Sequence, residues 1–544
     1  MFSIEEIKSK KYDCPSTPAP SWMQRLLHQH MKFISNLLLA LLCEAATLGI
    51  SAAKPSSSLP NIVLILADDL GYGDVRCYND QSKIPTPHLD RLAAEGLRFT
   101  DAHSPATVCT PSRYSLLTGQ MAFRVPNGGT VFQGAGGPSL IAAGRLTLPA
   151  MLKKQGYATA ATGKWHVGLT FKDADGVAIN SGKFEEVKRI DYTRRIEGGP
   201  LDHGFDHFFG TACCPTTDWI YAFIQGDRIP VPPTKVIDKS PLPKHPYADD
   251  CRPGMIAPDF SMEEADMVFL KKSREFLENH VRTSPGKPFF LFHATQSVHL
   301  PSFPGKDFKG KTSAGPHGDF IHELDEIVGT LMQDLERLGI ADKTLVLFSS
   351  DNGPETTAVV HMREDYNHDG ARPWRGVKRD AWEGGHRVPL IVRWPGRVKS
   401  ATTTDQVVSL TDVMATVAAI TGAALPNDAA EDSYNLLPLL EGKTALIRPH
   451  LLTQAFAGAK TLSIRRGKWK FIDHAGSGGN NYTTGEMKKF FLPEAVVNGI
   501  GQLYNLEADP GETTNLVSQQ PELAAELKAL LEQTKKTGRS APRR

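Results

Sequence analysis

Three short and mainly apolar runs divide the first two thirds of the chain. They cover residues 61–67, 288–294 and 344–350. An apolar run of this length without strict alternation is typical of a strand that is buried on both faces of a sheet. Segments in which apolar side chains recur at helical spacing lie between the runs, at 87–99, 261–280 and 317–338. The pattern therefore predicts strands that alternate with helices.

The helical segment at 261–280 also carries a start signal. Ser261 and Glu264 have the spacing of a capping box, in which each side chain satisfies a backbone N–H of the first turn. Alternating strands and helices indicate an α/β fold with a large, mostly parallel sheet that is flanked by helices. In such sheets, ligands collect at the carboxyl ends of the strands.

Side chains with oxygen donors follow two of the predicted strands directly. Asp68 and Asp69 come after the first run, and Asp351 and Asn352 come after the third. A single pair of this kind is usually a turn or a helix cap. Two pairs, each at the end of an apolar strand, are a stronger indication of a metal site. Carboxylate and amide oxygens are the ligands that Ca²⁺ or Mg²⁺ prefers, rather than zinc.

The last quarter of the chain has a different pattern. Two short runs flank Gly467 within 462–472 and predict a hairpin, and residues 521–536 predict an amphipathic helix. We therefore expect a smaller α+β domain over residues 423–544, after a larger domain over 60–422. Long loops rich in Gly, Pro or charge should shape a substrate pocket. They lie at 127–144, 230–253 and 301–318.

The N-terminal 53 residues have the features of a segment outside the folded enzyme. Met31 and Lys32 precede a short apolar stretch and then small residues up to Ala53, which is typical of a signal peptide over 31–53. Residues 1–30 are then an upstream leader or an artefact of the start site. A buried N-terminal helix is the alternative. Glu44 interrupts the apolar stretch, so no stable membrane span is expected.

The net charge and the cysteine count bear on the ligands and on the state of the thiols. The formal net charge of +1 gives no basis for nucleic-acid binding, so any anion site must be a local cluster. Cys14 and Cys43 lie in the N-terminal segments, which leaves five cysteines in the predicted domains. An odd number in an exported protein implies one unpaired thiol. We expect that thiol to be Cys109 and expect Cys213 or Cys214 to pair with Cys251; five reduced cysteines are the alternative.

Residues 109–119 read C-T-P-S-R-Y-S-L-L-T-G and are the most informative segment of the chain. Pro111 suits the first position of a helix, which would place Cys109 near the helix N-terminus. Free backbone N–H groups and the helix dipole favour an anion there. Arg113 adds a positive charge within about one turn.

This segment resembles the signature of the sulfatase family, C-x-P-S-R-x-S-L-L-T-G. Four further segments are similar to sulfatase motifs: G-K-W-H-V-G at 163–168, E-G-G-H-R-V-P at 383–389, W-P-G at 394–396 and L-Y-N-L-E-A-D-P-G-E at 503–512. The resemblance covers roughly residues 60–540. It implies an alkaline-phosphatase-like α/β fold. It also implies that Cys109 is oxidised to formylglycine, an aldehyde whose hydrate attacks the sulfur of a sulfate ester.

The resemblance also assigns a role to each candidate site residue. It makes Asp68, Asp69, Asp351, Asn352 and the modified residue 109 the ligands of a metal ion, usually Ca²⁺. It makes Arg113, Lys164, His166, His299 and Lys378 catalytic, with Cys109 as the source of the nucleophile. Lys164 and His166 would share one face of an extended segment. Val377 replaces a glycine that the family commonly has, so Arg379 competes with Lys378 for the inward position; we favour Lys378.

Together these features predict an exported, periplasmic or secreted arylsulfatase-type enzyme. Its expected substrates are aryl or carbohydrate sulfates, with sulfated carbohydrate as the natural class. The formylglycine would require a maturation enzyme as a partner. A phosphodiesterase or phosphonate monoester hydrolase on the same fold is one alternative. A non-catalytic relative that binds sulfated glycans is another, although every expected catalytic position is filled.

Overall fold

The computed structural model describes residues 59–179, 182–443, 446–490 and 501–543. The leader and signal peptide predicted over 1–53 lie outside the described residues. None of the helices in the described ranges combines the length and the apolar character that crossing a bilayer requires.

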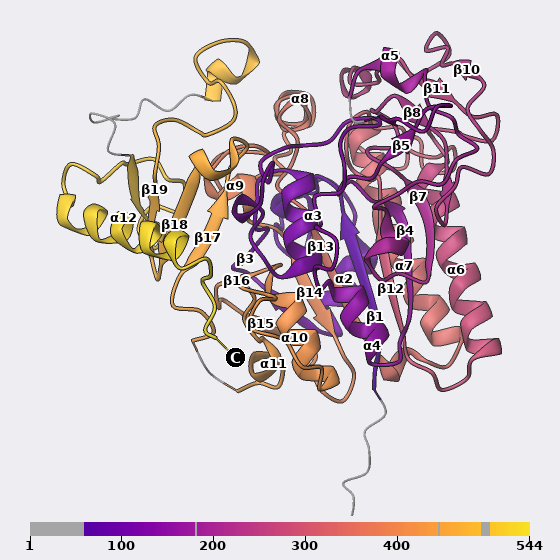
Figure 1. The fold of residues 1–544 in the computed structure, drawn as a ribbon. Helices are drawn as coiled ribbons and strands as arrows, with labels where there is room; N and C mark the ends of the chain where they lie inside the picture. Colours follow the sequence, from indigo (N-terminus) through magenta and orange to yellow (C-terminus); the bar gives the residue numbers. More distant parts are fainter. Residues whose placement is uncertain (1–58, 180–181, 444–445, 491–500, 544) are drawn as a thin grey trace, which may run out of the picture. The chain divides into compact units, whose positions relative to one another are not determined.

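A nine-stranded sheet forms the centre of the described chain (Figure 1). Its strands, from one edge to the other, are β15 (Thr402–Thr404), β2 (Leu97–Phe99), β14 (Leu390–Arg393), β13 (Thr344–Ser350), β1 (Asn61–Ala67), β12 (Phe289–Ala294), β4 (Ala158–Lys164), β7 (His207–Thr211) and β9 (Ile224–Gln225). The five strands from β13 to β7 are parallel, and antiparallel pairs occur toward both edges. This confirms the large, mostly parallel sheet.

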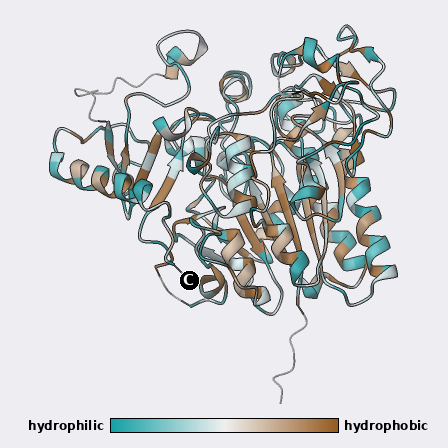
Figure 2. Ribbon diagram, in the orientation of Figure 1, coloured by the Kyte–Doolittle hydropathy of each residue, from teal (hydrophilic) through white to brown (hydrophobic). Residues whose placement is uncertain are grey.

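Side chains of β1 alternate between two hydrophobic cores, one on each face of the sheet. Ile62, Leu64 and Leu66 belong to one core, and Val63 and Ile65 belong to the other. Figure 2 shows the corresponding apolar colour along the central strands. Because both faces are covered, the strand sequence is apolar throughout and does not alternate.

Helices cover the two faces of this sheet. The first core includes residues of α3 (Cys109–Thr118), α4 (Leu148–Lys154) and α10 (Asp412–Thr421). The second includes residues of α2 (Pro87–Ala94), α6 (Ala265–Thr283) and α7 (Gly315–Arg337). The other α-helices before α12 are α5 (Phe184–Val187), α8 (Thr356–Tyr366), α9 (Glu383–His386) and α11 (Leu437–Leu440).

A separate antiparallel sheet follows in the last quarter of the chain. Its strands are β17 (Leu451–Gln454), β18 (Leu462–Arg466), β19 (Trp469–Ile472) and β20 (Gln502–Asn505). The amphipathic helix α12 (Pro521–Lys536) packs against it, with Leu527 and Leu531 in the same core as Ile464 and Phe471 (Figure 1). The remaining short strands are β3 (Ala102–His103), β5 (Phe171–Lys172), β6 (Ala178–Ile179), β8 (Ile220–Tyr221), β10 (Lys235–Val236), β11 (Met255–Ile256) and β16 (Val408–Ser409).

Three local predictions are wrong. The helix expected over 261–280 begins at Ala265, and no side-chain hydrogen bond caps it. The helix expected over 87–99 ends at Ala94, because the chain turns at Gly96 and continues as β2 between two partner strands. A Cβ on Gly96 would collide with the carbonyl oxygen of Val392 in β14. Pro111 is the third residue of its helix and not the first.

Candidate active site

The metal-ligand candidates meet because their two strands are neighbours. Ala67 at the end of β1 pairs in parallel with Ser350 at the end of β13, so both acidic segments emerge at the same edge of the sheet. The backbone N–H of Asp69 donates to Asp351 Oδ1 at 3.3 Å. Asn352 Nδ2 donates to Asp69 Oδ1 at 2.7 Å. All four candidate ligands are buried.

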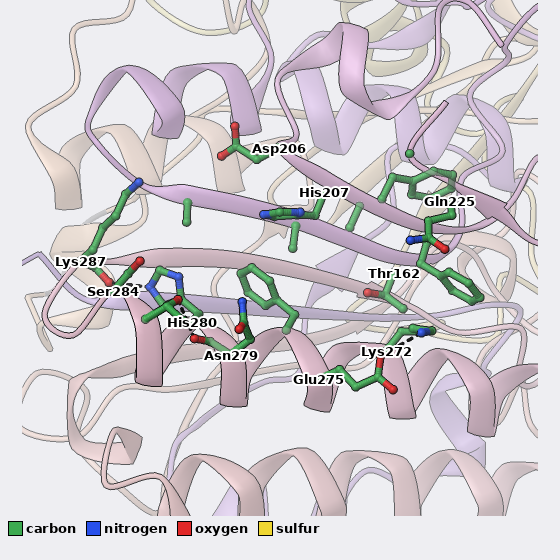
Figure 3. Close-up of a pocket in the computed structure, with 18 residues that line it drawn as sticks. Thr162, Asp206, His207, Gln225, Lys272, Glu275, Asn279, His280, Ser284 and Lys287 are labelled. Atoms are coloured by element: carbon green, nitrogen blue, oxygen red, sulfur yellow. Dashed lines mark hydrogen bonds and ion pairs between the residues drawn. The ribbon is translucent and has the colours of Figure 1, made fainter. Parts of the chain in front are cut away.

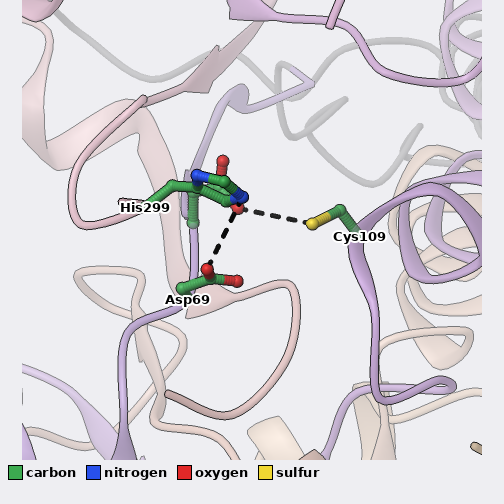
Figure 4. Close-up of side chains that lie close together, drawn as sticks. Asp69, Cys109 and His299 are labelled. Atoms are coloured by element: carbon green, nitrogen blue, oxygen red, sulfur yellow. Dashed lines mark hydrogen bonds and ion pairs between the residues drawn. The ribbon is translucent and has the colours of Figure 1, made fainter. Parts of the chain in front are cut away.

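Cys109 is the first residue of α3, and it lies next to the acidic segment that follows β1. Its thiol faces Asp68 Oδ1 at 3.6 Å. Figure 4 shows Cys109 on one side of a small space that Asp69 and His299 approach from the other side. Cys109 is only 1% exposed, and every other residue of α3 is buried as well.

Burial changes what the unmodified thiol can do. It raises the pKa of Cys109 far above its usual range, although the nearby Lys164 and Lys378 act in the opposite direction. As a plain cysteine, residue 109 is a protonated thiol and a poor nucleophile.

Arg113 joins three parts of the site from within α3. Its Nε donates to Asp351 Oδ2 at 2.8 Å, and its Nη1 donates to the backbone oxygen of Lys164 at 2.9 Å. Its Nη2 lies 3.8 Å from Asp68 Oδ2. The guanidinium is fully buried, so these contacts fix both its position and its charge.

Two lysines complete the positive side of the site. Lys164, at the end of β4, forms a buried ion pair with Asp68. Lys378 Nζ lies 2.7 Å from Asp69 Oδ2. Burial alone would lower the pKa of each lysine, but the adjacent carboxylate outweighs it and holds the pKa well above its usual range. Lys378 Nζ also lies 3.4 Å from Glu355, and Arg379 pairs with Glu355 at 2.7 Å. Of the two cations, Lys378 has the ion pair with Asp69, so it stays our candidate for the catalytic cation.

The two histidines reach the site from loops. His166 follows β4 with a positive φ of 58°, so it is not in the extended segment that its spacing suggested. His299 lies in the loop after β12, with Nε2 3.7 Å from Asp69 Oδ2. Burial lowers the pKa of both imidazoles, and it lowers the pKa of His299 to about 4.

The carboxylates of the site lie close enough to repel one another, which favours the binding of a cation between them. Burial and then the neighbouring Asp68 raise the pKa of Asp351 to about 6. The side-chain oxygen Oδ1 of Asn352 is buried and accepts no hydrogen bond from any described residue. A group of carboxylates with one unused amide oxygen is a donor set that fits a hard divalent cation such as Ca²⁺ or Mg²⁺.

A cavity of about 520 Å³ opens onto this constellation. Cys109, His166, His299 and Lys378 line it together with parts of two predicted loops, Gly129 to Gln133 and Asp250 to Arg252. The exposed side chain of Phe456 adds a wall from the segment after β17. The long loops therefore do shape a pocket over the candidate site, as the sequence predicted for some of them.

A larger cavity, of about 870 Å³, lies elsewhere. Figure 3 shows it between β7 and α6, with His207, Lys272, Glu275 and His280 among its lining residues. None of the site residues predicted from the sequence lines this cavity. This cavity is therefore separate from the candidate active site.

Sequence reasoning did not assign three side chains that line the pocket, namely Cys214, Asp218 and Glu355. The predicted disulfide is also wrong, because all five described cysteines are free. Cys214 Sγ lies near both site histidines. Cys251 Sγ instead contacts the hydroxyl of Tyr221 at 3.7 Å. The adjacent pair Cys213 and Cys214 is the sequence feature that marks this position, although two neighbouring cysteines do not indicate a place beside the site histidines.

The fold and the site are those of a sulfuric ester hydrolase, and comparison with known proteins agrees. The model of the sulfatase family matches residues 60–423, and the model of the N-sulphoglucosamine sulphohydrolase C-terminal region matches residues 374–475. The chain therefore belongs to the sulfatase family, whose members hydrolyse sulfate esters.

Individual relatives cover most of the chain. It is 33% identical to the N-acetylgalactosamine-6-O-sulfatase of Bacteroides thetaiotaomicron, over 88% of this chain and 94% of the relative. It is 33% identical to human arylsulfatase A, over 89% and 86%. A solved structure from work on glycosaminoglycan metabolism by Bacteroides thetaiotaomicron superposes with a TM-score of 0.74 and 31% identity, over 88% of this chain and 100% of that chain.

Proposed function

We propose that the chain is an exported, formylglycine-dependent sulfatase that removes sulfate from sulfated carbohydrates. The observation that carries this proposal is the position of Cys109. It stands at the buried start of α3, within the family signature, between a cluster of carboxylates and three cations. Burial raises the pKa of its thiol, which makes the unmodified cysteine a poor nucleophile and supports its conversion to another group.

Conversion of Cys109 to formylglycine would supply, as the hydrated aldehyde, an oxygen nucleophile for the sulfur atom. Asp68, Asp69, Asp351 and Asn352 would hold Ca²⁺, with Mg²⁺ as the alternative, and the ion would supply positive charge beside that oxygen. The unused oxygen of Asn352 supports this donor set.

The cations of the chain are arranged to receive a sulfate group. Arg113, Lys164 and Lys378 are buried, and contacts with carboxylates or the backbone fix each of them. Charge that is preorganised in a buried site stabilises the negative charge that develops on the sulfate oxygens and the leaving oxygen. A sulfate monoester carries one negative charge. The three cations and the divalent ion would balance that charge in addition to the charges of the carboxylates.

The histidines are placed for proton transfer on two sides of residue 109. His299 and Lys378 both face Asp69 Oδ2, so together they would stabilise or protonate the leaving oxygen. His166 donates from Nε2 to the carbonyl of Phe132 at 2.7 Å, which leaves Nδ1 as the acceptor of a proton. It would act as the base that regenerates the aldehyde.

The relatives support a carbohydrate as the natural substrate. Several are named for N-acetylgalactosamine 6-sulfate, and a solved structure of this fold is described in complex with D-glucosamine-2-N,6-O-disulfate. The pocket over residue 109 is polar on one side, where Asp250, Arg252 and Arg379 lie, and aromatic at Phe456. A sugar ring presents hydroxyl groups, which the charged side chains could bind, and an apolar face, which could pack against Phe456.

Mass spectrometry and kinetics test the proposal together. Protein made with a formylglycine-generating enzyme should carry the aldehyde at residue 109. It should hydrolyse an aryl sulfate with far higher kcat/KM than the aryl phosphate monoester with the same leaving group. Cys109→Ala should be inactive but folded. Full activity of a preparation with an intact thiol would overturn the proposal, and a phosphodiester preferred over the sulfate would favour the alternative hydrolase.

Export and domain organisation are part of the same proposal. The pattern at 31–53 supports a cleaved signal peptide, and mature protein from the native source should begin near Ala53 or Lys54. The larger domain would span 60–422 and the smaller one 423–544, with the boundary just after α10. A mature cytosolic protein that keeps residues 1–30 would contradict export.

A further inference from the structure

A second chemical group lies in the wall of the active-site cavity. Cys214, in the loop after β7, is buried and lines the cavity. Its Sγ lies 3.6 Å from His299 Nε2 and 3.9 Å from His166 Nδ1. One thiol therefore lies between the two imidazoles to which we assign proton transfer.

Backbone carbonyls fix which nitrogen of each imidazole faces the sulfur. His166 Nε2–H donates to the carbonyl of Phe132, and His299 Nδ1–H donates to the carbonyl of Leu300. Because a carbonyl only accepts, the nitrogens that face Cys214 carry the lone pairs of neutral rings. Histidines that bind metals are oriented in this way, with the second ring N–H donated to a carbonyl or carboxylate.

The two sulfur–nitrogen separations are close to those of a tetrahedral zinc site. Zn–S bonds of about 2.3 Å and Zn–N bonds of about 2.0–2.1 Å at tetrahedral angles place sulfur and nitrogen about 3.5 Å apart. The observed separations of 3.6 and 3.9 Å need little adjustment. A carboxylate oxygen of Asp218 lies within 4.8 Å of both His166 and Cys214 ligand atoms, which leaves the fourth position to Asp218 or a water.

The positive charges near the three side chains are paired with carboxylates. Lys164 is paired with Asp68, and Arg252 donates to Asp218 Oδ1 at 2.8 Å. The ligand types also differ from those of the first site. Thiol and imidazole select soft or borderline ions, whereas the oxygen cluster at the ends of β1 and β13 selects hard ones.

We propose that His166, Cys214 and His299 form a second metal site, which binds Zn²⁺ and thereby inhibits the enzyme. Binding replaces the thiol proton of Cys214, which is released to solvent, and uses the two lone pairs of the neutral imidazoles. Zn²⁺ binding depends only on the geometry described above. The inhibition rests in addition on the proposed function, because it assumes that both histidines transfer protons.

Binding is measured first, in a Cys109→Ser background that removes the other cavity thiol, with excess Ca²⁺ present. Zn²⁺ should bind at one equivalent by calorimetry, and Co²⁺ should give a thiolate-to-cobalt charge-transfer absorption. Cys214→Ser, and Cys214→Ala as a second variant, should remove the absorption and weaken Zn²⁺ binding by more than about 10-fold, since even outer-shell changes cost roughly 10–100-fold. Cys213→Ser is the matched control, because that thiol faces the carbonyl of Gly134 instead.

Equal Zn²⁺ affinity in the Cys213 and Cys214 variants would overturn the site, as would a lack of binding in the presence of excess Ca²⁺. Inhibition is then measured on active protein that contains formylglycine. Zn²⁺ should inhibit competitively against an aryl sulfate, and Cys214→Ser should raise the inhibition constant relative to Cys213→Ser. Binding through Cys214 without any inhibition would overturn the inhibitory role and would contradict the histidine roles, while the absence of all turnover would contradict the proposed function alone.

Discussion

Asp69 shows how closely the single residues of the site are matched to one another. Its carboxylate receives Lys378 and Asn352 Nδ2 and lies near His299. Burial would raise its pKa, but Lys378 and His299 outweigh burial and keep the pKa below its usual value. Buried charges persist only when such partners compensate them. Each substitution in this group should therefore change the charge state of its neighbours as well as its own contact.

His299 offers a test at the scale of one residue. His299→Ala should reduce kcat/KM for a carbohydrate sulfate by roughly 10²–10⁴-fold, the usual contribution of a positioned acid or base. The loss should be much smaller for an activated aryl sulfate, whose leaving oxygen needs little protonation. Rates for a series of leaving groups give the comparison. A loss that is independent of the leaving group would show that His299 does not act on the departing oxygen.

The identity of the site residues was predictable from sequence, but their arrangement was only partly so. The signature around Cys109 and the pairs after two apolar strands identified the residues that the structure brings together. The raised pKa of the Cys109 thiol was not predictable from the sequence, because it comes from the complete burial of the helix start, which only the packing of the fold produces. The position of Cys214 between the two histidines depends on loop conformations that no local pattern encodes.

At the scale of elements, the register of two strands brings the proposed metal ligands together. Ala67 and Ser350 are partners at the ends of β1 and β13, so the residues that follow them lie together. Continuous apolar runs predicted these strands correctly, because a strand that is covered on both faces must carry apolar side chains on both faces. The short strand β2 was missed because Leu97 and Phe99 are buried in either conformation, and only pairing with β14 and β15 makes them extended.

A pair of substitutions on β13 and its flanks tests the metal site. Ca²⁺ should raise the Tm of the wild-type protein, because it binds the folded state and not the unfolded chain. Asp351→Asn, at the carboxyl end of β13, should abolish most of this shift. Asp342→Asn, an exposed position just before the same strand, should retain it. Equal Ca²⁺-dependent shifts in both variants, measured by calorimetry, would exclude Asp351 as a ligand.

The end of β4 depends on close contact between two backbones. Gly163 has a φ of 103°, and an added Cβ would collide with the carbonyl oxygen of Ala294 in the neighbouring β12. Gly163 also precedes Lys164 and so determines where the lysine enters the site. A side chain at this position would force the strands apart next to Lys164.

Gly163→Ala should therefore lower the free energy of unfolding by more than the ~0.5–3 kcal/mol usual for single substitutions. Gly156→Ala is the control, because Gly156 also has a positive φ but has open space around an added Cβ. It should cost only about 1–2 kcal/mol for the strained backbone. Urea unfolding of both variants gives the comparison, and similar losses would mean that the collision at Ala294 is relieved easily.

At the scale of the whole molecule, a buried ionic network joins the small C-terminal sheet to α9, the helix that precedes β14 of the large sheet. Lys470 Nζ, on β19, lies 2.9 Å from Glu383 Oε1 of α9 and 2.9 Å from Glu512 Oε1, in the segment after β20. The backbone N–H of Glu383 donates to Glu512 Oε2 at 2.6 Å. Two carboxylates thus share one lysine at the junction, and the family motif at 383–389 has a structural role there.

This network predicts a dependence of stability on pH. Burial raises the pKa of Glu512 to about 7, with Glu383 adding to the rise while Lys470 opposes it. Since the folded pKa exceeds the unfolded one, this stabilising contribution is complete below about pH 4.5 and is lost as the pH rises through about 7. Glu512→Gln lacks that loss. Its stability relative to wild type should therefore increase by about 2 kcal/mol between pH 5 and pH 8.

Urea unfolding at several pH values, with Ca²⁺ in excess, measures this difference. Glu522→Gln, at an exposed position at the start of α12, is the control and should follow wild type across the range. A Glu512→Gln curve that runs parallel to wild type would show that the network does not bind a proton in this range.

The complete burial of α3 has a consequence for when residue 109 can be modified. Every residue from Cys109 to Thr118 is buried, so a maturation enzyme that must bind this segment cannot reach it in the folded protein. The oxidation proposed for Cys109 would then belong to synthesis and translocation, before folding. A molecule that folds first keeps its thiol permanently. The active fraction of a preparation would therefore depend on the rate of Cys109 oxidation relative to the rate of folding. Later treatment of the folded protein with the maturation enzyme would not increase it.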